Sequence, residues 1–427
     1  YASEDADIVF QLSQLLYEKL KNKNLLEPYI NIELPLIPVL INIEKNGVFL
    51  DLKFIETLSE DCAKILSELT EKIIVMSGRE FNINSPKQLA EVLFDELNLK
   101  QIRKRSTSVE VLENLKKYHP LPELILEYRH IAKLKSTYLD SFPNYINSYT
   151  QRVHTSMNQT VAATGRLSSA SPNFQNIPIR TKSGRQLRKA FIAQNKDWVI
   201  LSADYSQVEL RIMAHFSNEK ELIRAFKNNE DIHIKTASIV NGISLSEVTK
   251  EQRQAAKVVN FGIMYGAGPY RMSQELGITM KDASMLIENY FNTYAGIRRY
   301  IDKTIDMARE KGYVETLFGR RRRVLNLDAS NKNIIQAEKR MAINMPIQGT
   351  AADLIKIAMI KIYNKIIEQK FESKMILQIH DELLFECPIS EVEEFGLMVK
   401  KEMESAIKLS VPLKVDWNYG KSWYEAH

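Results

Sequence analysis

Two aspartates follow apolar, strand-like runs in distant parts of the sequence. Asp204 follows "VILSA", and Asp381, with Glu382 directly after it, follows "MILQIH". A carboxylate beside a buried strand must be neutral or have its charge compensated. A divalent cation would compensate both, and two-metal sites clamp the attacking and leaving oxygens of a phosphoryl displacement. The pattern favours metal-assisted phosphoryl transfer, whereas either aspartate taken alone is more often a turn residue at a strand end.

A second set of residues falls at steps of four in "RQAAKVVNFGIMYGAG". Arg253, Lys257, Phe261 and Tyr265 would share one helix face. Two cations followed by two aromatics suit a ligand with phosphates at one end and a flat base at the other. The glycines after Phe261 would end the helix. The alternative is an amphipathic helix with an aromatic core face and solvated basic residues, and spacing alone does not separate the two.

These residues need strands and helices to hold them. We expect a strand over residues 198–203 followed by a helix, and a hairpin over residues 373–388 with the acids between its two apolar runs. A second hairpin is expected to turn near Gly319, and residues 349–367 to form a long helix. By itself the basic stretch 319–323, "GRRRR", is typical of a solvated basic turn; in a chain that binds a nucleic acid, it would add to the electrostatic field around that partner.

The first third of the chain has a different sequence pattern, which is mainly helical. Residues 51–147 look mostly helical, with Ser85 as an N-cap and Pro86 at the first helical position of one helix. Pro35 and Pro38 argue against a strong helix before that region. "LKQIRKRSTS" predicts a short basic loop, either solvated or touching phosphates.

Composition narrows the class of protein. A chain of 427 residues predicts two to four subdomains, and 44% hydrophobic with 26% charged residues is typical of a globular protein. A net charge of +5 fits a nucleic-acid partner without establishing one. Cys62 and Cys387 form no metal-ligand pattern and suggest a reducing compartment. We identify no apolar run of membrane-spanning length and no signal peptide, and a start at Tyr1 suggests a piece of a longer protein.

Three stretches carry a resemblance to a known family. "SADYSQVELRIMAH", "RQAAKVVNFGIMYGAG" and "QIHDELLFE" resemble motifs A, B and C of the family A DNA polymerases, above all the polymerase fragment of the bacterial enzymes. The resemblance continues in order through "VAATGRLSSASPNFQNIPIR", "DIHIKTA", "GYVETLFGRRRR", "AINMPIQGTAADLIK" and the terminal "WYEAH". It implies a multidomain α+β fold, the right-hand polymerase, with an antiparallel-sheet palm, a helical thumb and helical fingers.

The resemblance also implies a division of the chain. Residues 1–50 would end an exonuclease domain and lead into the palm, and residues 51–149 would form the thumb. Residues 150–215 and 319–427 would form the palm, and residues 216–318 the fingers.

Catalytic roles carry over to matching positions. Asp204 and Asp381 match the two metal-binding catalytic aspartates, the Tyr205 carbonyl would be a further metal ligand, and Glu382 matches a supporting acid. The implied cofactor is two Mg²⁺ ions, with Mn²⁺ able to substitute. One ion would help deprotonate the primer 3′-hydroxyl, and the other would hold the triphosphate and the departing pyrophosphate.

The nucleotide pocket is matched in the same way. Arg253 and Lys257 would bind the triphosphate, Tyr265 would stack at the templating position, and Phe261 would pack against the deoxyribose. Glu209 matches the steric gate against a ribose 2′-hydroxyl. The matched pocket positions are Gln207, Glu209, His233, Arg253, Lys257, Phe261 and Tyr265.

Five further positions match DNA contacts of the family. Arg166, Gln348 and His380 would lie near the primer terminus and minor groove, and Arg340 and Asn344 on the template side. Minor-groove acceptors recur in all correct base pairs, so donors placed there test pair shape without reading sequence. Without the resemblance, the alternative for Gln348 is the N-terminal cap region of a helix, "PIQGTAAD".

The implied function is template-directed, primer-dependent DNA synthesis, in which dNMP is transferred from dNTP to the primer 3′-hydroxyl and pyrophosphate is released. The implied partners are primer–template DNA and dNTPs, with no membrane, and the chain would be a monomer. A bacterial source would place it in the cytoplasm at the nucleoid, and an organelle or a phage-infected host stays open.

The alternative functions are those of a single-subunit RNA polymerase or reverse transcriptase, and of a catalytically inactive DNA-binding module. Glu209 with "NFGIMYG" argues against an RNA polymerase, and the retained Asp204, Asp381, Arg253 and Lys257 argue against an inactive module.

The N-terminus departs from the family pattern. "YASEDAD" resembles the last 3′–5′ exonuclease motif, with Tyr1 and Asp5 in matching places, but the earlier motifs are absent. One aspartate cannot assemble a two-metal site, so we expect no proofreading by this chain.

Overall fold

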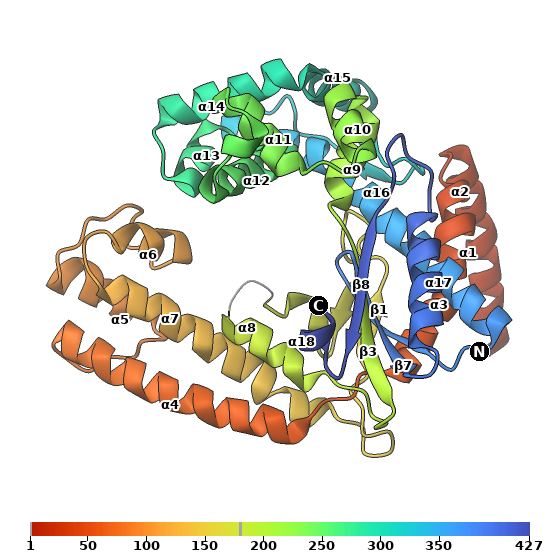
Figure 1. Cartoon of the computed structure of the whole chain (residues 1–427), viewed down its shortest axis with the longest axis horizontal. Helices are drawn as coiled ribbons and strands as arrows, with labels where there is room; N and C mark the ends of the chain where they lie inside the picture. The colour runs from red at the N-terminus through yellow and green to blue at the C-terminus, as the bar shows by residue number, and fades with distance from the viewer. Residues whose placement is uncertain (1, 179–181) are drawn as a thin grey trace. The chain divides into compact units, whose positions relative to one another are not determined.

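The computed structural model describes residues 2–178 and 182–427 (Figure 1). The chain forms two compact units, and each is described by itself. The first unit holds every candidate site residue that the sequence identifies. Unit 1 comprises the chain up to Asn46, Ser156–Ala170 and Leu201–Asn418, and unit 2 comprises Gly47–Thr155, Ser171–Ile200 and Tyr419–His427.

Most residues of a four-stranded sheet belong to unit 1 (Figure 1). Its strand order is β6-β7-β3-β8, and β6 and β7 are the antiparallel arms of the expected hairpin. Every residue of β7 is buried, including Glu382 and Glu386, so packing holds the strand that follows the two-residue turn. The bounds are β3 Trp198–Tyr205, β6 Lys374–Ile379, β7 Glu382–Pro388 and β8 Val415–Gly420.

Helices follow β3 and continue for more than a hundred residues. The predicted helix after Asp204 is α9, Val208–Ser217. The predicted cationic–aromatic helix is α12, Lys250–Met264, which begins with a capping box between Thr249 and Gln252 and ends just before Gly266, at φ +67°. The others are α10 Lys220–Lys227, α11 Ile232–Asn241, η7 Leu245–Glu247, α13 Pro269–Leu276, α14 Met280–Thr293 and α15 Ala295–Lys311.

Two short hairpins complete the strands of unit 1. β4, Tyr313–Glu315, pairs with β5, Arg321–Arg323, and Gly319 in the turn has φ +80°, so the expected hairpin is confirmed. β1, Ser156–Asn158, pairs with β2, Ser168–Ala170.

The predicted long helix is longer than expected. α16 runs from Lys332 to Gln369 over 38 residues and contains Pro346. Gln348 therefore lies in a helix interior, and the alternative that placed it in an N-terminal cap region is wrong. Proline normally breaks a helix interior. Fifteen buried residues, Pro346 among them, anchor α16 to the core of unit 1 both before and after the proline, which offsets the lost hydrogen bond.

The N-terminal segment is also more helical than its prolines suggested. It forms α1 Ala2–Asn22, α2 Leu26–Pro28, η1 Tyr29–Glu33 and α3 Leu34–Asn46, with Pro38 inside α3. Pro35 follows the π-helical turn η1 inside the continuous helical stretch Leu26–Asn46, so its missing N–H is not one of the free N–H groups of a helix start. The buried side chains Leu36, Val39, Leu40 and Ile43 stabilise α3 despite Pro38.

One stretch corrects the expectation that no apolar run of the chain reaches membrane-spanning length. By length and composition alone, Leu26–Asn46 could cross a membrane, with a mean hydropathy of 1.2. A core helix satisfies the same test, and this stretch makes core contacts within unit 1: Glu33 pairs with Lys356, and Asn46 Nδ2 donates to the Met375 carbonyl.

Unit 2 is largely helical, as expected for residues 51–147. α4 and α7 pack side by side (Figure 1), and Ser85 caps α5 by accepting from the Gln88 amide, as predicted. Arg105 in the basic loop binds Asp95 through two bonds of 2.6 and 2.7 Å. The helices are α4 Leu52–Ser77, α5 Pro86–Glu91, η2 Val92–Glu96, α6 Val109–Leu115, α7 Leu121–Leu134, η3 Lys135–Leu139, η4 Phe142–Tyr145, η5 Phe174–Asn176, α8 Lys182–Leu187, η6 Arg188–Ala190 and α18 Trp423–Ala426.

Candidate active site

Asp204 and Asp381 lie next to each other in unit 1. The Tyr205 amide donates to the Asp381 carbonyl over 3.3 Å, which joins the end of β3 to the turn between β6 and β7. Asp204 Oδ1 is buried and has no hydrogen-bond partner. Burial raises the pKa of Asp204 to about 8, with further contributions from Asp381, Glu382 and Asp416. The fold therefore concentrates negative charge at this point of the sheet.

Glu382 has different surroundings from Asp381. Ser202 Oγ donates to Glu382 Oε1 over 2.6 Å, and the Glu382 residue is 4% exposed. His380 and Asp381 form the turn itself, with Ile379 paired to Glu382 across it. His380 is exposed with φ +56°, and Gln378 Nε2 donates to its carbonyl over 2.6 Å. The turn presents Asp381, while a hydroxyl on β3 holds Glu382 on the sheet.

The carboxylates fit a divalent cation with few protein ligands. Among the described residues, no group of three or more His, Cys, Asp or Glu side chains is arranged to hold a metal ion. Mg²⁺ is commonly bound by one or two carboxylates, with substrate phosphates and water completing its shell. The unpartnered Asp204 oxygen and the raised pKa both indicate negative charge that a cation would compensate.

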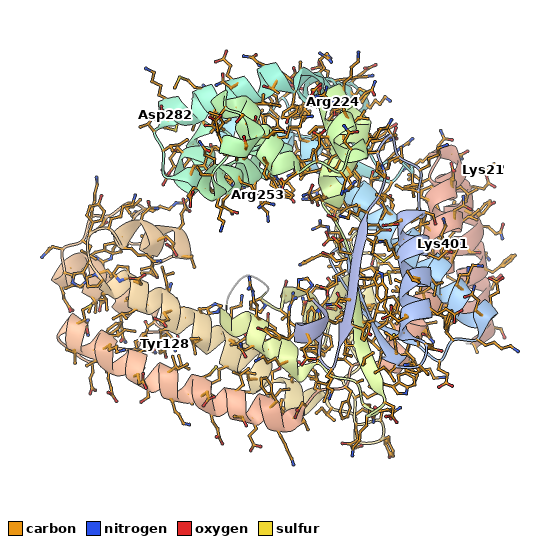
Figure 2. The ribbon with its side chains drawn as sticks, viewed as in Figure 1. Lys21, Tyr128, Arg224, Arg253, Asp282 and Lys401 are labelled. Carbon is orange, nitrogen blue, oxygen red and sulfur yellow. The ribbon has the colours of Figure 1, made fainter. Side chains whose placement is uncertain are left out.

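The two cationic side chains of α12, Arg253 and Lys257, have different surroundings. Arg253 (labelled in Figure 2) pairs with Asp231 through its Nε and one terminal nitrogen, each at 2.9 Å. Asp231 also caps α11 by accepting from the His233 and Ile234 amides. Lys257 is exposed one turn further along the same face. Asp231 therefore fixes the orientation of Arg253 and leaves one of its terminal nitrogens outside this ion pair.

The aromatic side chains at the C-terminal end of α12 lie next to the buried side chain of His233. Phe261 lies 6.3 Å from Tyr265 with ring planes 25° apart, and 6.0 Å from the His233 ring. Asn260 Nδ2 lies 3.0 Å from His233 Nδ1, and Thr236 Oγ1 donates to Asn260 Oδ1 over 3.2 Å. The pKa of His233 is lowered to about 4, chiefly by burial, with smaller contributions from Arg253 and Lys257 and an opposing one from Asp231. His233 is therefore a neutral group at pH 7.

Glu209 lies in the first turn of α9 with both carboxylate oxygens engaged. Tyr265 Oη donates to Oε2 over 2.5 Å, and an Arg166 terminal nitrogen donates to Oε1 over 2.7 Å. The Glu209 residue is 7% exposed, and burial raises its pKa, although Tyr265 and Arg166 favour the ionised form. Gln207 is half-buried at the start of α9 in a left-handed conformation, with φ +55°.

Three matched DNA-contact residues lie on one face of α16. Arg340, Asn344 and Gln348 are spaced by four, and Arg340 is exposed. The Arg340 side chain packs on Gly266, where an added Cβ would meet Arg340 Cγ at 3.0 Å. Asn344 Oδ1 is buried without a partner. This face of α16 therefore packs against Gly266, which follows Tyr265 in the sequence.

Three supporting residues were missed at the sequence level. Asp231, before "IHI", fits the N-cap pattern and could have been recognised. Asn260 and Arg211 belong to no sequence pattern that could have identified them. Arg211 Nε donates to the Ser206 carbonyl over 2.8 Å and another of its nitrogens to the Pro412 carbonyl over 2.6 Å, which holds the segment between β3 and α9.

Comparisons with known proteins agree with this architecture. The sequence profile of DNA polymerase family A matches residues 52–425. The chain is 46% identical over 431 residues to the thermostable DNA polymerase I of Thermus filiformis, covering 100% of this chain and 51% of that protein. It is 45% identical over 419 residues to DNA polymerase I of Bacillus subtilis, covering 97% and 48%. The chain thus spans about half the length of these curated relatives.

A solved structure matches almost the whole fold. The polymerase domain of Pol1 from M. smegmatis, in complex with DNA primer-template and dNTP, superposes with a TM-score of 0.94 at 40% identity, covering 98% of this chain and 74% of that one. The fold is the α+β right-hand polymerase fold, as predicted. The chain belongs to DNA polymerase family A. The boundaries of palm, thumb and fingers and the roles of the site residues stay predictions.

Proposed function

We propose that this chain catalyses template-directed, primer-dependent DNA synthesis, transferring dNMP from dNTP to a primer 3′-hydroxyl and releasing pyrophosphate. The observation that carries the proposal is the pairing of Asp204 with Asp381 through the Tyr205–Asp381 backbone hydrogen bond. In a family A chain, this pair is where phosphoryl-transfer chemistry would be supported.

Asp204, Asp381 and the Tyr205 carbonyl would hold the divalent cations, for which we propose Mg²⁺, with Mn²⁺ able to substitute. When bound, the cations supply charge neutralisation on the reacting phosphate and help the primer hydroxyl lose its proton. Ser202 keeps Glu382 on the sheet, so Glu382 acts through the local field and has a supporting role.

Arg253 and Lys257 would bind the triphosphate. Asp231 fixes the Arg253 guanidinium in advance, which lowers the ordering cost of binding a phosphate. His233, buried and neutral, would donate or accept a hydrogen bond and add no charge to a site already rich in cations.

Sugar and base would be recognised at the far end of α12. Glu209, held between Tyr265 and Arg166, would occupy the space that a ribose 2′-hydroxyl needs. Phe261 would pack on the deoxyribose, Tyr265 would stack at the templating position, and Gln207 would border the nucleotide.

Primer–template DNA and dNTPs are the proposed partners, in line with the molecules bound to the Pol1 domain of M. smegmatis. Arg166, Gln348 and His380 would face the primer end, and Arg340 and Asn344 the template. We further propose that the chain acts as a monomer, without a membrane partner, at the nucleoid of a bacterial cytoplasm.

Primer extension with labelled primer–template tests the proposal. The unsubstituted chain should extend the primer with dNTPs, and Asp381→Ala should abolish extension. Asp302→Ala removes an exposed acid of α15 and should extend normally. Extension by Asp381→Ala at the unsubstituted rate would refute the two-metal assignment. Extension with rNTPs alone would favour an RNA polymerase, and DNA binding without extension a non-catalytic module.

The same assay tests the proofreading prediction. Asp5 is an exposed residue of α1, and Tyr1 lies outside the described residues. A labelled primer with a mismatched 3′ end should keep its length when incubated without dNTPs, and its shortening would contradict the prediction.

A further inference from the structure

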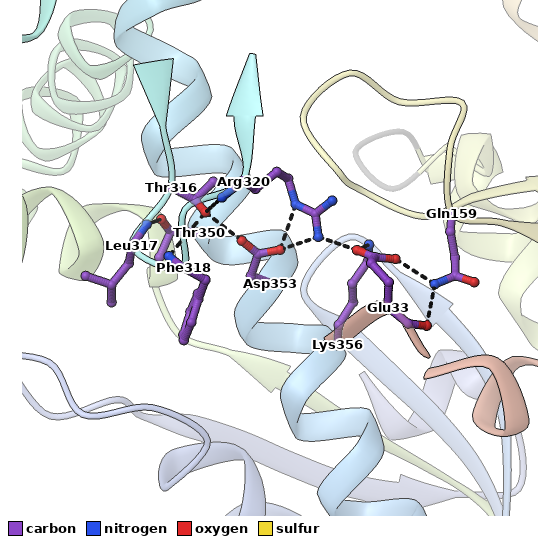
Figure 3. A network of polar contacts seen from close by, with 9 residues as sticks. All are labelled: Glu33, Gln159, Thr316, Leu317, Phe318, Arg320, Thr350, Asp353 and Lys356. Carbon is purple, nitrogen blue, oxygen red and sulfur yellow. Dashed lines mark hydrogen bonds and ion pairs between the residues drawn. The ribbon is translucent and has the colours of Figure 1, made fainter. Parts of the chain in front are cut away.

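Four charged side chains form a compact cluster in unit 1 (Figure 3). Glu33, Arg320, Asp353 and Lys356 are here called the four-charge cluster. Lys356 and Asp353 are fully buried on α16, whereas the Glu33 and Arg320 side chains are about one-fifth exposed. With two positive and two negative groups, the cluster is neutral in total.

The cluster links three segments that are far apart in sequence. Arg320 donates to Asp353 Oδ1 through Nε at 2.8 Å and through a terminal nitrogen at 2.7 Å, and it also pairs with Glu33. Lys356 Nζ donates to Glu33 Oε1 over 2.8 Å. The N-terminal segment, the β4–β5 turn and α16 are therefore fixed to one another.

These contacts limit what two arginines of the basic stretch 319–323 can contribute to a field around a nucleic acid. Arg320 is turned into the cluster, where two carboxylates neutralise it, and Arg321 pairs with Glu315 at 3.1 Å. Arg320 is thus committed to interactions inside unit 1, so its contribution to a field around DNA is largely cancelled.

The cluster also holds both ends of the loop that precedes Arg166. Gln159 Nε2 donates to Glu33 Oε2 over 2.6 Å and to the Glu33 carbonyl over 3.1 Å. At the other end, Gly165 lies against Arg320: an added Cβ would meet Arg320 Nε at 2.5 Å, and Gly165 has φ +83°. The next residue is Arg166, which binds Glu209.

A second branch of contacts reaches the residue beside Gln348. Thr316 Oγ1 donates to Asp353 Oδ2 over 2.8 Å, and Thr316 Cγ2 packs on Gly349, where an added Cβ would lie 2.5 Å away. That Cβ would also meet the Thr164 carbonyl at 3.1 Å, so α16 approaches the same loop closely.

We infer that the four-charge cluster is a positioning device for sugar selection: Arg320 and Glu33 hold the loop from Gln159 to Gly165, which sets Arg166 against the Glu209 carboxylate. Arg320 and Gln159 are positioning residues that act through Arg166. This inference rests on the proposed function, because Glu209 must border the nucleotide sugar for its placement to matter.

Loss of stability alone does not test this role. Removing one partner from a buried ion pair destabilises any fold, because the remaining charge is left uncompensated. The ratio of kcat/KM for dCTP to kcat/KM for rCTP is a better measure, since the concentration of active enzyme cancels from it. A cluster that only stabilises the fold would leave this ratio unchanged.

The test compares single variants of the whole chain in steady-state primer extension with dCTP and rCTP. Gln159→Ala leaves the four charges in place and removes the link from Glu33 to the loop. We expect it to lower the dCTP/rCTP ratio about fivefold. Arg320→Lys keeps the positive charge but loses the planar guanidinium, and Arg320→Met loses both. The dCTP/rCTP ratio should therefore fall in Arg320→Lys and fall further in Arg320→Met.

Two further variants serve as controls. Arg129→Met removes a partly buried arginine of unit 2 that donates to the Thr107 carbonyl, and it should lower the melting temperature without changing the ratio. Arg166→Ala should lower the ratio directly. Ratios in Gln159→Ala and Arg320→Lys within twofold of the unsubstituted chain, while Arg166→Ala lowers it, would overturn the inference. No extension by the unsubstituted chain would instead refute the proposed function.

Discussion

The hydroxyl of Tyr265 donates to the carboxylate of Glu209 over 2.5 Å and so joins the end of α12 to the first turn of α9. Arg166 holds the other carboxylate oxygen at 2.7 Å. A buried carboxylate with both oxygens bound has little freedom to move aside. The arrangement therefore makes Glu209 a rigid obstacle at the proposed position of the sugar.

Glu209→Ala should admit ribonucleotides. Removing the side chain opens the space that we assign to a 2′-hydroxyl, so the dNTP/rNTP ratio of kcat/KM should fall by roughly tenfold or more. Glu209→Gln keeps the volume and should change the ratio less. Matched single-nucleotide extension with dNTP and rNTP measures both, and equal ratios in Glu209→Ala and the unsubstituted chain would remove Glu209 from this role.

Phe261→Tyr should raise the acceptance of dideoxynucleotides. Phe261 lies between the His233 and Tyr265 rings, where a new hydroxyl could take the place of a missing sugar 3′-hydroxyl. A competition between ddNTP and dNTP gives the incorporation ratio, and Phe261→Leu is the control without a hydroxyl. If the tyrosine and leucine variants incorporate ddNTPs equally, the assignment of Phe261 to the sugar is wrong.

His233 should make the fold less stable in acid. Its pKa falls from 6.5 in the unfolded chain to about 4 in the fold, mainly because of burial. The unfolded state then binds more protons between these values, so the free energy of unfolding falls as pH drops from 6.5 to 4, by up to roughly 3 kcal/mol. His233→Gln should reduce this slope in urea titrations at pH 4, 5 and 6.5, and an identical slope would contradict the pKa assignment.

Local features were readable from the sequence because a few neighbouring residues decide them. Ser85 caps α5 within one turn, Gly266 ends α12, and Gly319 makes the β4–β5 turn. β3, which contains Asp204, and β6, which ends two residues before Asp381, were likewise visible as apolar runs that lead to an acid.

Other features depend on partners that the local sequence does not contain. Pro38 and Pro346 remain inside helices because buried side chains on α3 and α16 outweigh a missing hydrogen bond. Arg320 looked like part of a solvated basic turn, but Glu33, 287 positions away, turns it inward. The resemblance to family A identified candidate residues, whereas the Glu209–Arg166 contact and the four-charge cluster needed the fold.

Asp204 should make the metal-free protein less stable at higher pH. Burial first, and then Asp381, Glu382 and Asp416, raise its pKa from 3.8 to about 8. The folded state binds more protons at Asp204 between these values, so the stability that Asp204 contributes is fully present below about pH 4 and is lost as pH rises through 8. In EDTA at pH 8, Asp204→Asn should therefore raise Tm, by about 2 °C or more, whereas Asp302→Asn, at an exposed position of α15, should not. Millimolar Mg²⁺ should raise the Tm of the unsubstituted chain and have less effect on Asp204→Asn, because it compensates the same charge. Equal Mg²⁺ shifts in both proteins would show that the cation binds elsewhere.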